Sequence, residues 1–189
     1  MVNHSLAPNR RAGLAGTREF LAETAHRIVL VATSLGAFVA PLAAQALQPI
    51  AIVLVNPLLP MPGETIEAWE GNAGAEPARV AAAQRGGYSA RFDPHTHLMH
   101  DIPPDILVTA TPKGDQSPRP FRDPCTFDDW PAPVTVIASR GDRVFPVEFQ
   151  QRLAHERLGI DAVVVPGGHL VALSHPVERT DAILAGTNS

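Results

Sequence analysis

Residues 29–37 read Val29-Leu30-Val31-Ala32-Thr33-Ser34-Leu35-Gly36-Ala37 and give the strongest indication of the fold of this chain. The β-branched and apolar residues at its start predict a buried strand, and the small residues after Ser34 predict a helix. The pattern Ala32-x-Ser34-x-Gly36 is close to G-x-S-x-G, the sharp turn that lifts a serine hydroxyl clear of a sheet. Small residues suit this turn because strand and helix approach closely there. Ordinary strand-to-helix turns share the pattern, so both interpretations stay open for this stretch alone.

The composition is that of one globular domain. The chain has 189 residues, enough for a substantial core but too few for two such domains. Its net charge of -4 gives no basic surface for nucleic acid. Cys125 is the single cysteine, so no intrachain disulfide can form. We therefore expect a cytoplasmic protein in which Cys125 is an incidental thiol.

The uncharged run Ile28–Leu47 is as long as a membrane-spanning helix. However, Pro41 interrupts it, and a second apolar run over 49–62 follows without a loop. Buried parallel strands also form continuous apolar runs, so a strand, a buried helix and a second strand explain both segments. The segment before the run contains Glu19 and Glu23 and lacks a compact basic start, which argues against a signal peptide. We expect no membrane insertion.

Strands and helices alternate along much of the chain. The predicted elements are a helix over 17–26, a strand over 28–32, a helix over 35–47, a strand over 51–56, a strand over 134–138, a helix over 147–158, a strand over 162–165, and a helix over 170–184 that breaks near Pro176. Helical crossovers between strands imply parallel pairing. We therefore predict an α/β fold, with a mostly parallel sheet and helices on both faces.

One long segment departs from this alternation. Residues 57–133 carry most of the prolines and both tryptophans, without long periodicity. A structureless loop of that length would be unusual in a compact domain, so we expect a short helical cap insertion at about 62–122. Residues 1–16 are polar and irregular, and residues 17–189 are expected to form a single domain that includes this cap.

Ser34, Asp142 and His169 each come just past the carboxyl end of a predicted strand. In open α/β sheets this edge is where ligands bind. A serine hydroxyl becomes a strong nucleophile only when a histidine accepts its proton, and that histidine needs a carboxylate to fix its tautomer. The three residues therefore predict a site for nucleophilic catalysis.

Five motifs carry a resemblance to a known family. They are Ser34-Leu35-Gly36, Val53-Leu54-Val55-Asn56-Pro57, Pro60-Met61-Pro62-Gly63-Glu64-Thr65, Asp142-Arg143-Val144-Phe145-Pro146 and Pro166-Gly167-Gly168-His169-Leu170. Over about residues 17–185 the chain resembles the α/β-hydrolase superfamily, specifically its small-esterase and hydroxynitrile-lyase-like branch. The resemblance implies that Ser34 is the nucleophile, Asp142 the acid of the triad and His169 the general base.

The same resemblance implies a substrate and a pocket. A small carboxylic ester or related acyl compound would be cleaved through an acyl-enzyme, with no cofactor. The backbone amide of Leu35 would be one oxyanion-hole donor, and the cap would cover the acyl pocket. The residues expected to line this pocket are Thr33, Leu58, His100, Phe145 and Leu170.

The front of the chain departs from the family pattern. About four strands precede the nucleophile in that family, whereas Ser34 comes early in this chain. We therefore expect an N-terminally truncated fold without the loop that supplies the second oxyanion amide, a loss worth on the order of 10²–10³ in rate. The strand over 28–32 would be an exposed edge, free to pair with a second copy of the chain. The alternative function is accordingly that of a weak or inactive hydrolase-like protein.

The stretch Asp93-Pro94-His95-Thr96-His97-Leu98-Met99-His100-Asp101 leaves a second alternative open. Three histidines and two aspartates would suffice for a zinc-type site in a metal-dependent hydrolase. Metal sites of the His-x-His type follow a barrel strand, and no apolar strand precedes this stretch. We therefore expect no metal here, with His95 and His97 solvated and with Leu98 and Met99 packed inward.

Overall fold

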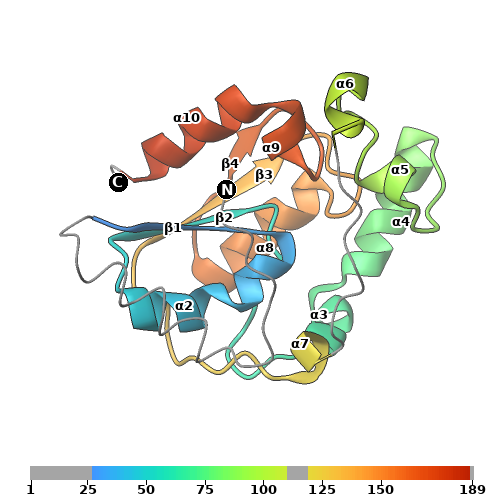
Figure 1. Ribbon diagram of the computed structural model, residues 1–189. Helices are drawn as coiled ribbons and strands as arrows, with labels where there is room; N and C mark the ends of the chain where they lie inside the picture. Colours follow the sequence, from blue (N-terminus) through green and yellow to red (C-terminus); the bar gives the residue numbers. More distant parts are fainter. Residues whose placement is uncertain (1–26, 110–118, 188–189) are drawn as a thin grey trace.

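Four parallel strands form the sheet of the computed structural model, which describes residues 27–109 and 119–187 (Figure 1). The strands are β1 (Val29–Thr33), β2 (Ala51–Val55), β3 (Val134–Ser139) and β4 (Val163–Val165), and they lie side by side in that order. The register pairs Leu30 with Ile52, Leu54 with Val136, and Ile137 with Val163. The predicted strands are thus confirmed to within about one residue at each end. The segments predicted over 1–16 and 17–26 lie outside the described residues.

The helices around the sheet follow the predicted alternation, although two of them are divided. They are the 3-10 helix η1 (Ser34–Phe38), α2 (Ala40–Leu47), α8 (Val147–Leu158), α9 (Val171–Ser174) and α10 (Pro176–Gly186). The chain becomes α-helical only at Ala40, and Pro41 lies in the first turn. N–H groups in the first turn have no partner within the helix, so proline is tolerated there. Pro176 opens α10 in the same way, which explains the break from α9. The helix predicted over 147–158 is confirmed at both ends.

Side chains of β2 alternate between the two faces of the sheet, and helices cover both faces. Ile52 and Leu54 pack in one core with residues of α2 and α8, whereas Val53 and Val55 pack with residues of α9 and α10. Figure 1 shows these two pairs of helices on opposite sides of the sheet. All four β2 side chains are fully buried, and each such burial stabilises the fold by about 1.5–3 kcal/mol.

Between β2 and β3, after Asn56 at the end of β2, the chain makes a long excursion, named here the β2–β3 insertion (residues 57–133). Its described helices are α3 (Ile66–Ala73), α4 (Ala75–Gly86), α5 (Pro94–His97), α6 (Pro104–Leu107) and α7 (Arg119–Arg122). In Figure 1 they lie together to one side of the sheet. The Thr65 hydroxyl accepts a hydrogen bond from the Ala68 N–H group (3.1 Å), which fixes the start of α3. The part of the insertion that the structure describes, residues 57–109 and 119–133, is therefore built of short helices and turns, as predicted.

Trp69 anchors the insertion to the rest of the protein. Its ring is buried and packs edge-on against Phe145 (5.3 Å between ring centroids) and against Phe149 of α8 (6.0 Å). Its indole N–H donates to the carbonyl oxygen of Leu59 (2.8 Å), so the buried polar group has a partner. One aromatic side chain thus joins α3, α8 and the loop after β3.

A buried ion pair also connects the insertion to α8. Arg157 Nη1 lies 2.6 Å from Glu64 Oε2, and both side chains are almost completely buried. The remaining capacity of Glu64 is satisfied by the Met61 N–H group (3.0 Å) and the Asn72 amide (3.0 Å). Buried charges are tolerated when they are paired and hydrogen-bonded in this way.

Candidate active site

Ser34 stands at the turn between β1 and η1, in a strained conformation. Its φ angle is 52°, in the left-handed region that residues with a side chain rarely adopt. Backbone strain of this kind costs about 1–3 kcal/mol and is concentrated at functional sites. The predicted sharp turn at Ala32-x-Ser34-x-Gly36 is therefore a real feature of the backbone.

A chain of hydrogen bonds joins Ser34, His169 and Asp142. The Oγ atom of Ser34 lies 2.9 Å from Nε2 of His169, and Nδ1 of His169 lies 2.8 Å from Oδ2 of Asp142. The histidine and aspartate side chains are buried, while Ser34 is half-buried. When Nδ1–H donates to the carboxylate, Nε2 is left as an acceptor for the serine hydroxyl proton. The arrangement can therefore activate the Ser34 oxygen for attack on an electrophilic carbon.

The Asp142 carboxylate is fixed by donors on both of its oxygens. Oδ1 accepts the N–H groups of Val144 (2.8 Å) and Phe145 (3.0 Å), and Oδ2 accepts the Gln150 side-chain amide (3.2 Å) as well as the histidine. Gln150 is itself held by the carbonyl oxygen of Phe145 (2.7 Å). The loop after β3 and the first turns of α8 thus hold the carboxylate in place and satisfy its buried charge.

Asn56 organises the loops behind this trio, a role that the sequence did not reveal. It follows β2 with a φ angle of 45°, a conformation that asparagine tolerates better than most residues. Its Oδ1 accepts the Ser139 N–H group (2.8 Å), and its Nδ2 donates to Ser139 Oγ (2.9 Å). The same Nδ2 donates to the carbonyl oxygens of Gly168 (3.3 Å) and His169 (2.9 Å). The only signal in the sequence is a polar residue directly after an apolar strand.

Two glycines shape the loop that carries His169. Gly167 has a φ angle of 98°, and a Cβ atom there would lie 2.7 Å from Nδ1 of His175. At Gly168 a Cβ atom would lie 2.6 Å from Oδ1 of Asp101. Gly167 is therefore required by its backbone conformation, whereas a side chain at Gly168 would force the Asp101 and His100 side chains to move.

Two of the predicted pocket residues contact the hydrogen-bonded trio. The ring of Phe145 packs edge-on against the His169 ring, with 5.3 Å between centroids. The Leu58 N–H group donates to the carbonyl oxygen of Ser34 (3.2 Å), and its side chain is half-buried. Both residues therefore lie beside the reacting groups.

The other predicted pocket residues have more varied surroundings. Leu170, next to the histidine, is half-buried, whereas the Thr33 side chain is exposed. Leu35, the expected oxyanion-hole donor, is half-buried next to the serine. His100 comes from the insertion, and its Cε1 would lie 2.8 Å from a Cβ atom at Gly168. His100 is thus beside the histidine loop, and burial followed by the nearby Arg143 charge lowers its pKa below the ordinary value.

The histidine-rich stretch differs from the prediction at one position. His97 was expected to be solvated, but it is completely buried, between Phe92 (5.5 Å between ring centroids) and Tyr88 (5.8 Å). Its Nδ1 lies 3.0 Å from the carbonyl oxygen of Asp93. His95 is exposed. Among residues 27–109 and 119–187, no group of three or more His, Cys, Asp or Glu side chains is arranged to hold a metal ion. The stretch therefore gives no support to the metal-dependent alternative.

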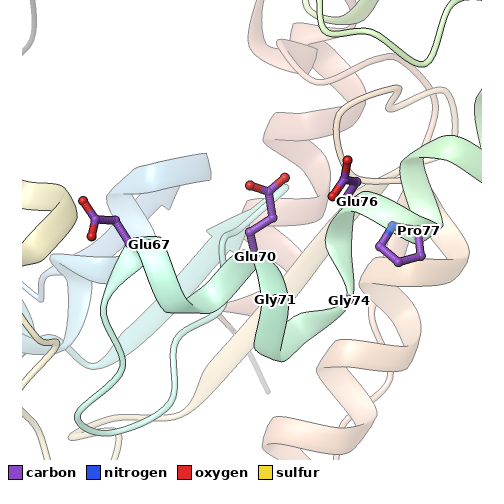
Figure 2. A pocket seen from close by; sticks show the side chains of 6 residues that line it. All are labelled: Glu67, Glu70, Gly71, Gly74, Glu76 and Pro77. Atoms are coloured by element: carbon purple, nitrogen blue, oxygen red, sulfur yellow. The ribbon is translucent and has the colours of Figure 1, made fainter.

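An acidic hollow of about 410 Å³ lies over the junction of α3 and α4 (Figure 2). It is lined by Glu67, Glu70, Gly71, Gly74, Glu76 and Pro77. Two of its carboxylates already have partners, since Glu67 pairs with Arg122 (3.4 Å) and Glu70 with Arg79 (3.3 Å). The lining contains no nucleophile or histidine, so the hollow contributes nothing to the chemistry described above.

The fold is a parallel sheet covered by helices on both faces, with a strained serine after one strand and an aspartate and a histidine after two others. This arrangement defines the class of α/β-hydrolase folds. The model of the Alpha/beta hydrolase family matches residues 3–183, and this chain belongs to that family. The expected superfamily and fold class are thereby confirmed. No curated protein matches the sequence.

Solved structures of several enzymes are similar to this chain. A pyrethroid hydrolase from Sphingobium faniae shares 18% identity, with 97% of this chain and 79% of that chain covered and a TM-score of 0.66. Polyneuridine aldehyde esterase shares 16% identity, with coverage of 97% and 86% and a TM-score of 0.67. A tomato methylketone synthase I variant shares 17% identity, with coverage of 96% and 79% and a TM-score of 0.63. At these identities the likeness shows the fold.

Family membership supports a hydrolase that acts on a small molecule, and it disfavours the inactive alternative. Within the described residues, no helix has the length and apolar character needed to cross a membrane. The long uncharged run is instead divided among β1, η1 and α2, as its interpretation as strand plus buried helix predicted.

Proposed function

We propose that the protein is a serine hydrolase that cleaves a small carboxylic ester or related acyl compound through an acyl-enzyme. The observation that carries this proposal is the continuous hydrogen-bonded sequence from Ser34 Oγ through His169 to the Asp142 carboxylate. The names of two similar structures, a pyrethroid hydrolase and polyneuridine aldehyde esterase, give further support for an ester-type substrate.

In the first half of the proposed reaction, Ser34 Oγ attacks the ester carbonyl carbon while Nε2 of His169 accepts the hydroxyl proton. The buried Asp142 carboxylate stabilises the imidazolium that forms. The carbonyl π electrons move to its oxygen, giving a tetrahedral oxyanion. When the tetrahedral intermediate collapses, the bond from its carbon to the alkoxide oxygen breaks, and the imidazolium gives its proton to that oxygen, which leaves as the alcohol.

In the second half, water attacks the acyl group on Ser34. Nε2 of His169 takes one proton of that water and returns it to the Ser34 oxygen as the acyl bond breaks, which releases the carboxylic acid. The backbone N–H group of Leu35, directly after the nucleophile, is proposed as one donor to the oxyanion. Donors already aimed at the developing charge are the largest single contribution in reactions of this type.

We further propose that the β2–β3 insertion covers the acyl pocket. His100 lies beside Gly168, Leu58 bonds to the Ser34 carbonyl oxygen, and Phe145 packs on the His169 ring. These side chains, with Leu170, would surround the acyl group with mostly apolar atoms, which favours a small uncharged ester.

The proposal is tested by covalent labelling with a fluorophosphonate, followed by intact-mass measurement and peptide mapping. We expect the folded wild-type protein to gain one probe at Ser34 and the Ser34→Ala variant to gain none. Ser174→Ala is the matched control, since Ser174 is a half-buried serine that contacts His175 and lies outside the proposed triad. This variant should be labelled like the wild type.

Hydrolysis of p-nitrophenyl acetate, butyrate and octanoate then tests the substrate class. A small acyl pocket predicts a higher kcat/KM for the acetate and butyrate esters than for octanoate. Absence of labelling in the folded wild-type protein, or labelling that persists in Ser34→Ala, would show that the proposed nucleophile is wrong.

A further inference from the structure

The loop that carries His169 is held from two sides. From the sheet, Asn56 Nδ2 donates to the carbonyl oxygens of Gly168 (3.3 Å) and His169 (2.9 Å). From the insertion, Oδ2 of Asp101 accepts the Gly168 N–H group at 2.5 Å. We propose that Asp101 is a positioning residue, through which the β2–β3 insertion fixes the histidine loop in its working geometry. This inference rests on the function proposed for His169.

The packing around Gly168 supports a specific contact. A Cβ atom at Gly168 would lie 2.6 Å from Asp101 Oδ1 and 2.8 Å from His100 Cε1, so the insertion is pressed directly against the loop backbone. A residue with a side chain at this position would displace the two side chains from the loop. The Asp101 carboxylate also lies 4.0 Å from Nδ1 of His175, just beyond the loop.

The position of the Asp101 carboxylate is unfavourable for the stability of the fold. Its side chain is largely buried, and within the described parts of the chain its Oδ1 atom has no hydrogen-bond partner. A buried carboxylate oxygen without a partner is unfavourable. The charge-assisted bond from the Gly168 N–H group is the contact that offsets this cost, because bonds to a charged acceptor are the stronger ones.

The insertion also reaches the loop that carries Asp142. Arg143, the next residue, donates through Nη1 to the carbonyl oxygen of Thr96 (3.1 Å), and its guanidinium lies 4.5 Å from the centre of the Tyr88 ring. The insertion therefore contacts the residue before the proposed base and the residue after the proposed acid. Of these two contacts, the one from Asp101 holds the backbone N–H group of the residue before His169, whose ring transfers the protons in the proposed reaction.

The geometry predicts how loss of this contact would act. His169 must keep Nε2 within hydrogen-bond distance of Ser34 Oγ and Nδ1 within reach of Asp142, and small displacements at such sites are costly. A displaced loop slows proton transfer, which lowers kcat, whereas the pocket walls that set KM stay in place.

The test compares Asp101→Ala and Asp101→Asn with the matched control Asp105→Ala, an exposed carboxylate at the start of α6. With p-nitrophenyl acetate, Asp101→Ala should lower kcat between about tenfold and a hundredfold with little change in KM. Asp101→Asn keeps an oxygen acceptor and should restore most of kcat. Asp105→Ala should match the wild type.

A second measurement does not depend on activity. In ¹⁵N-correlated NMR spectra, the Gly168 amide proton should lie downfield in the wild-type protein, as expected for a bond to a carboxylate, and should move upfield in Asp101→Ala. An unchanged Gly168 signal in Asp101→Ala, an unchanged kcat, or an Asn variant as slow as the Ala variant would overturn the inference. If the Gly168 signal responds as expected but the wild-type protein takes no fluorophosphonate, the contact stands and the proposed function fails.

Discussion

Asn56 and Ser139, which are 83 residues apart in the chain, form two hydrogen bonds with each other. The Ser139 N–H group donates to Asn56 Oδ1 (2.8 Å), and Asn56 Nδ2 donates to Ser139 Oγ (2.9 Å). Both residues are fully buried at the carboxyl ends of neighbouring strands. Because Asn56 also bonds to the His169 carbonyl oxygen, this pair links β2 and β3 to the histidine loop.

Replacement of Asn56 by glycine should destabilise the protein. It leaves the buried Ser139 N–H group and the His169 carbonyl oxygen without their partner, at an expected cost of about 2–4 kcal/mol in the free energy of unfolding. Urea denaturation measures this. Asn56→Ala should lower the free energy of unfolding by about 1–2 kcal/mol more than the glycine variant, because alanine disfavours the left-handed backbone conformation that glycine adopts easily. A glycine variant as stable as the wild type would contradict the structural role of the amide.

Asp142→Asn should reduce activity far more than stability. The asparagine Oδ1 can still accept the Val144 and Phe145 N–H groups, and the bond from the Gln150 amide is lost, so we expect the variant to fold with only a modest loss of stability. Its amide group, however, would donate to Nδ1 of His169 and leave the proton on Nε2, where it cannot accept the Ser34 proton. We expect kcat for p-nitrophenyl acetate to fall by about 10⁴-fold. A fall of less than tenfold in a folded variant would argue against Asp142 as the acid.

Glu64→Ala should be strongly destabilising, since it leaves the Arg157 guanidinium buried without its partner. Loss of one member of a buried pair costs about 3–5 kcal/mol in the free energy of unfolding. The matched control is Glu67→Ala, which removes an exposed pair with Arg122 and should cost no more than about 1 kcal/mol. Chemical denaturation of both variants checks the difference, and equal costs would contradict the prediction.

Stability should depend on the protonation of His100. Burial, together with the Arg143 charge, lowers the pKa of His100 from its ordinary value of 6.5. The unfolded chain therefore binds this proton more readily, so the His100 contribution is complete above pH 6.5 and is lost as the pH falls towards the folded-state pKa. Between pH 7.5 and 5.5, His100→Gln should lose less stability than the wild type in urea denaturation.

The control for this prediction is His155→Gln, which replaces an exposed histidine on α8. It should follow the wild-type pH profile. If His100→Gln showed the same slope as the wild type and the control, the histidine would contribute nothing to the pH dependence of folding.

The strands, the parallel sheet and the turn at Ser34 could all be predicted from the sequence. These follow from local patterns, because continuous apolar runs become buried strands, proline fixes helix starts at Pro41 and Pro176, and small residues permit the turn. The sequence also predicted that Ser34, Asp142 and His169 would meet, since the carboxyl ends of parallel strands share one edge of the sheet.

The contacts that hold these three residues in place emerge from the folded structure alone. The bonds from Asn56 to Ser139 and His169, and from Gly168 to Asp101, join residues 67 to 113 positions apart. No local pattern encodes them, because each depends on how far the insertion and the strand ends approach one another. The burial of His97 between two aromatic rings has the same origin. Histidine is found both at the surface and in the core of proteins, so its burial depends on the tertiary packing and not on the local sequence.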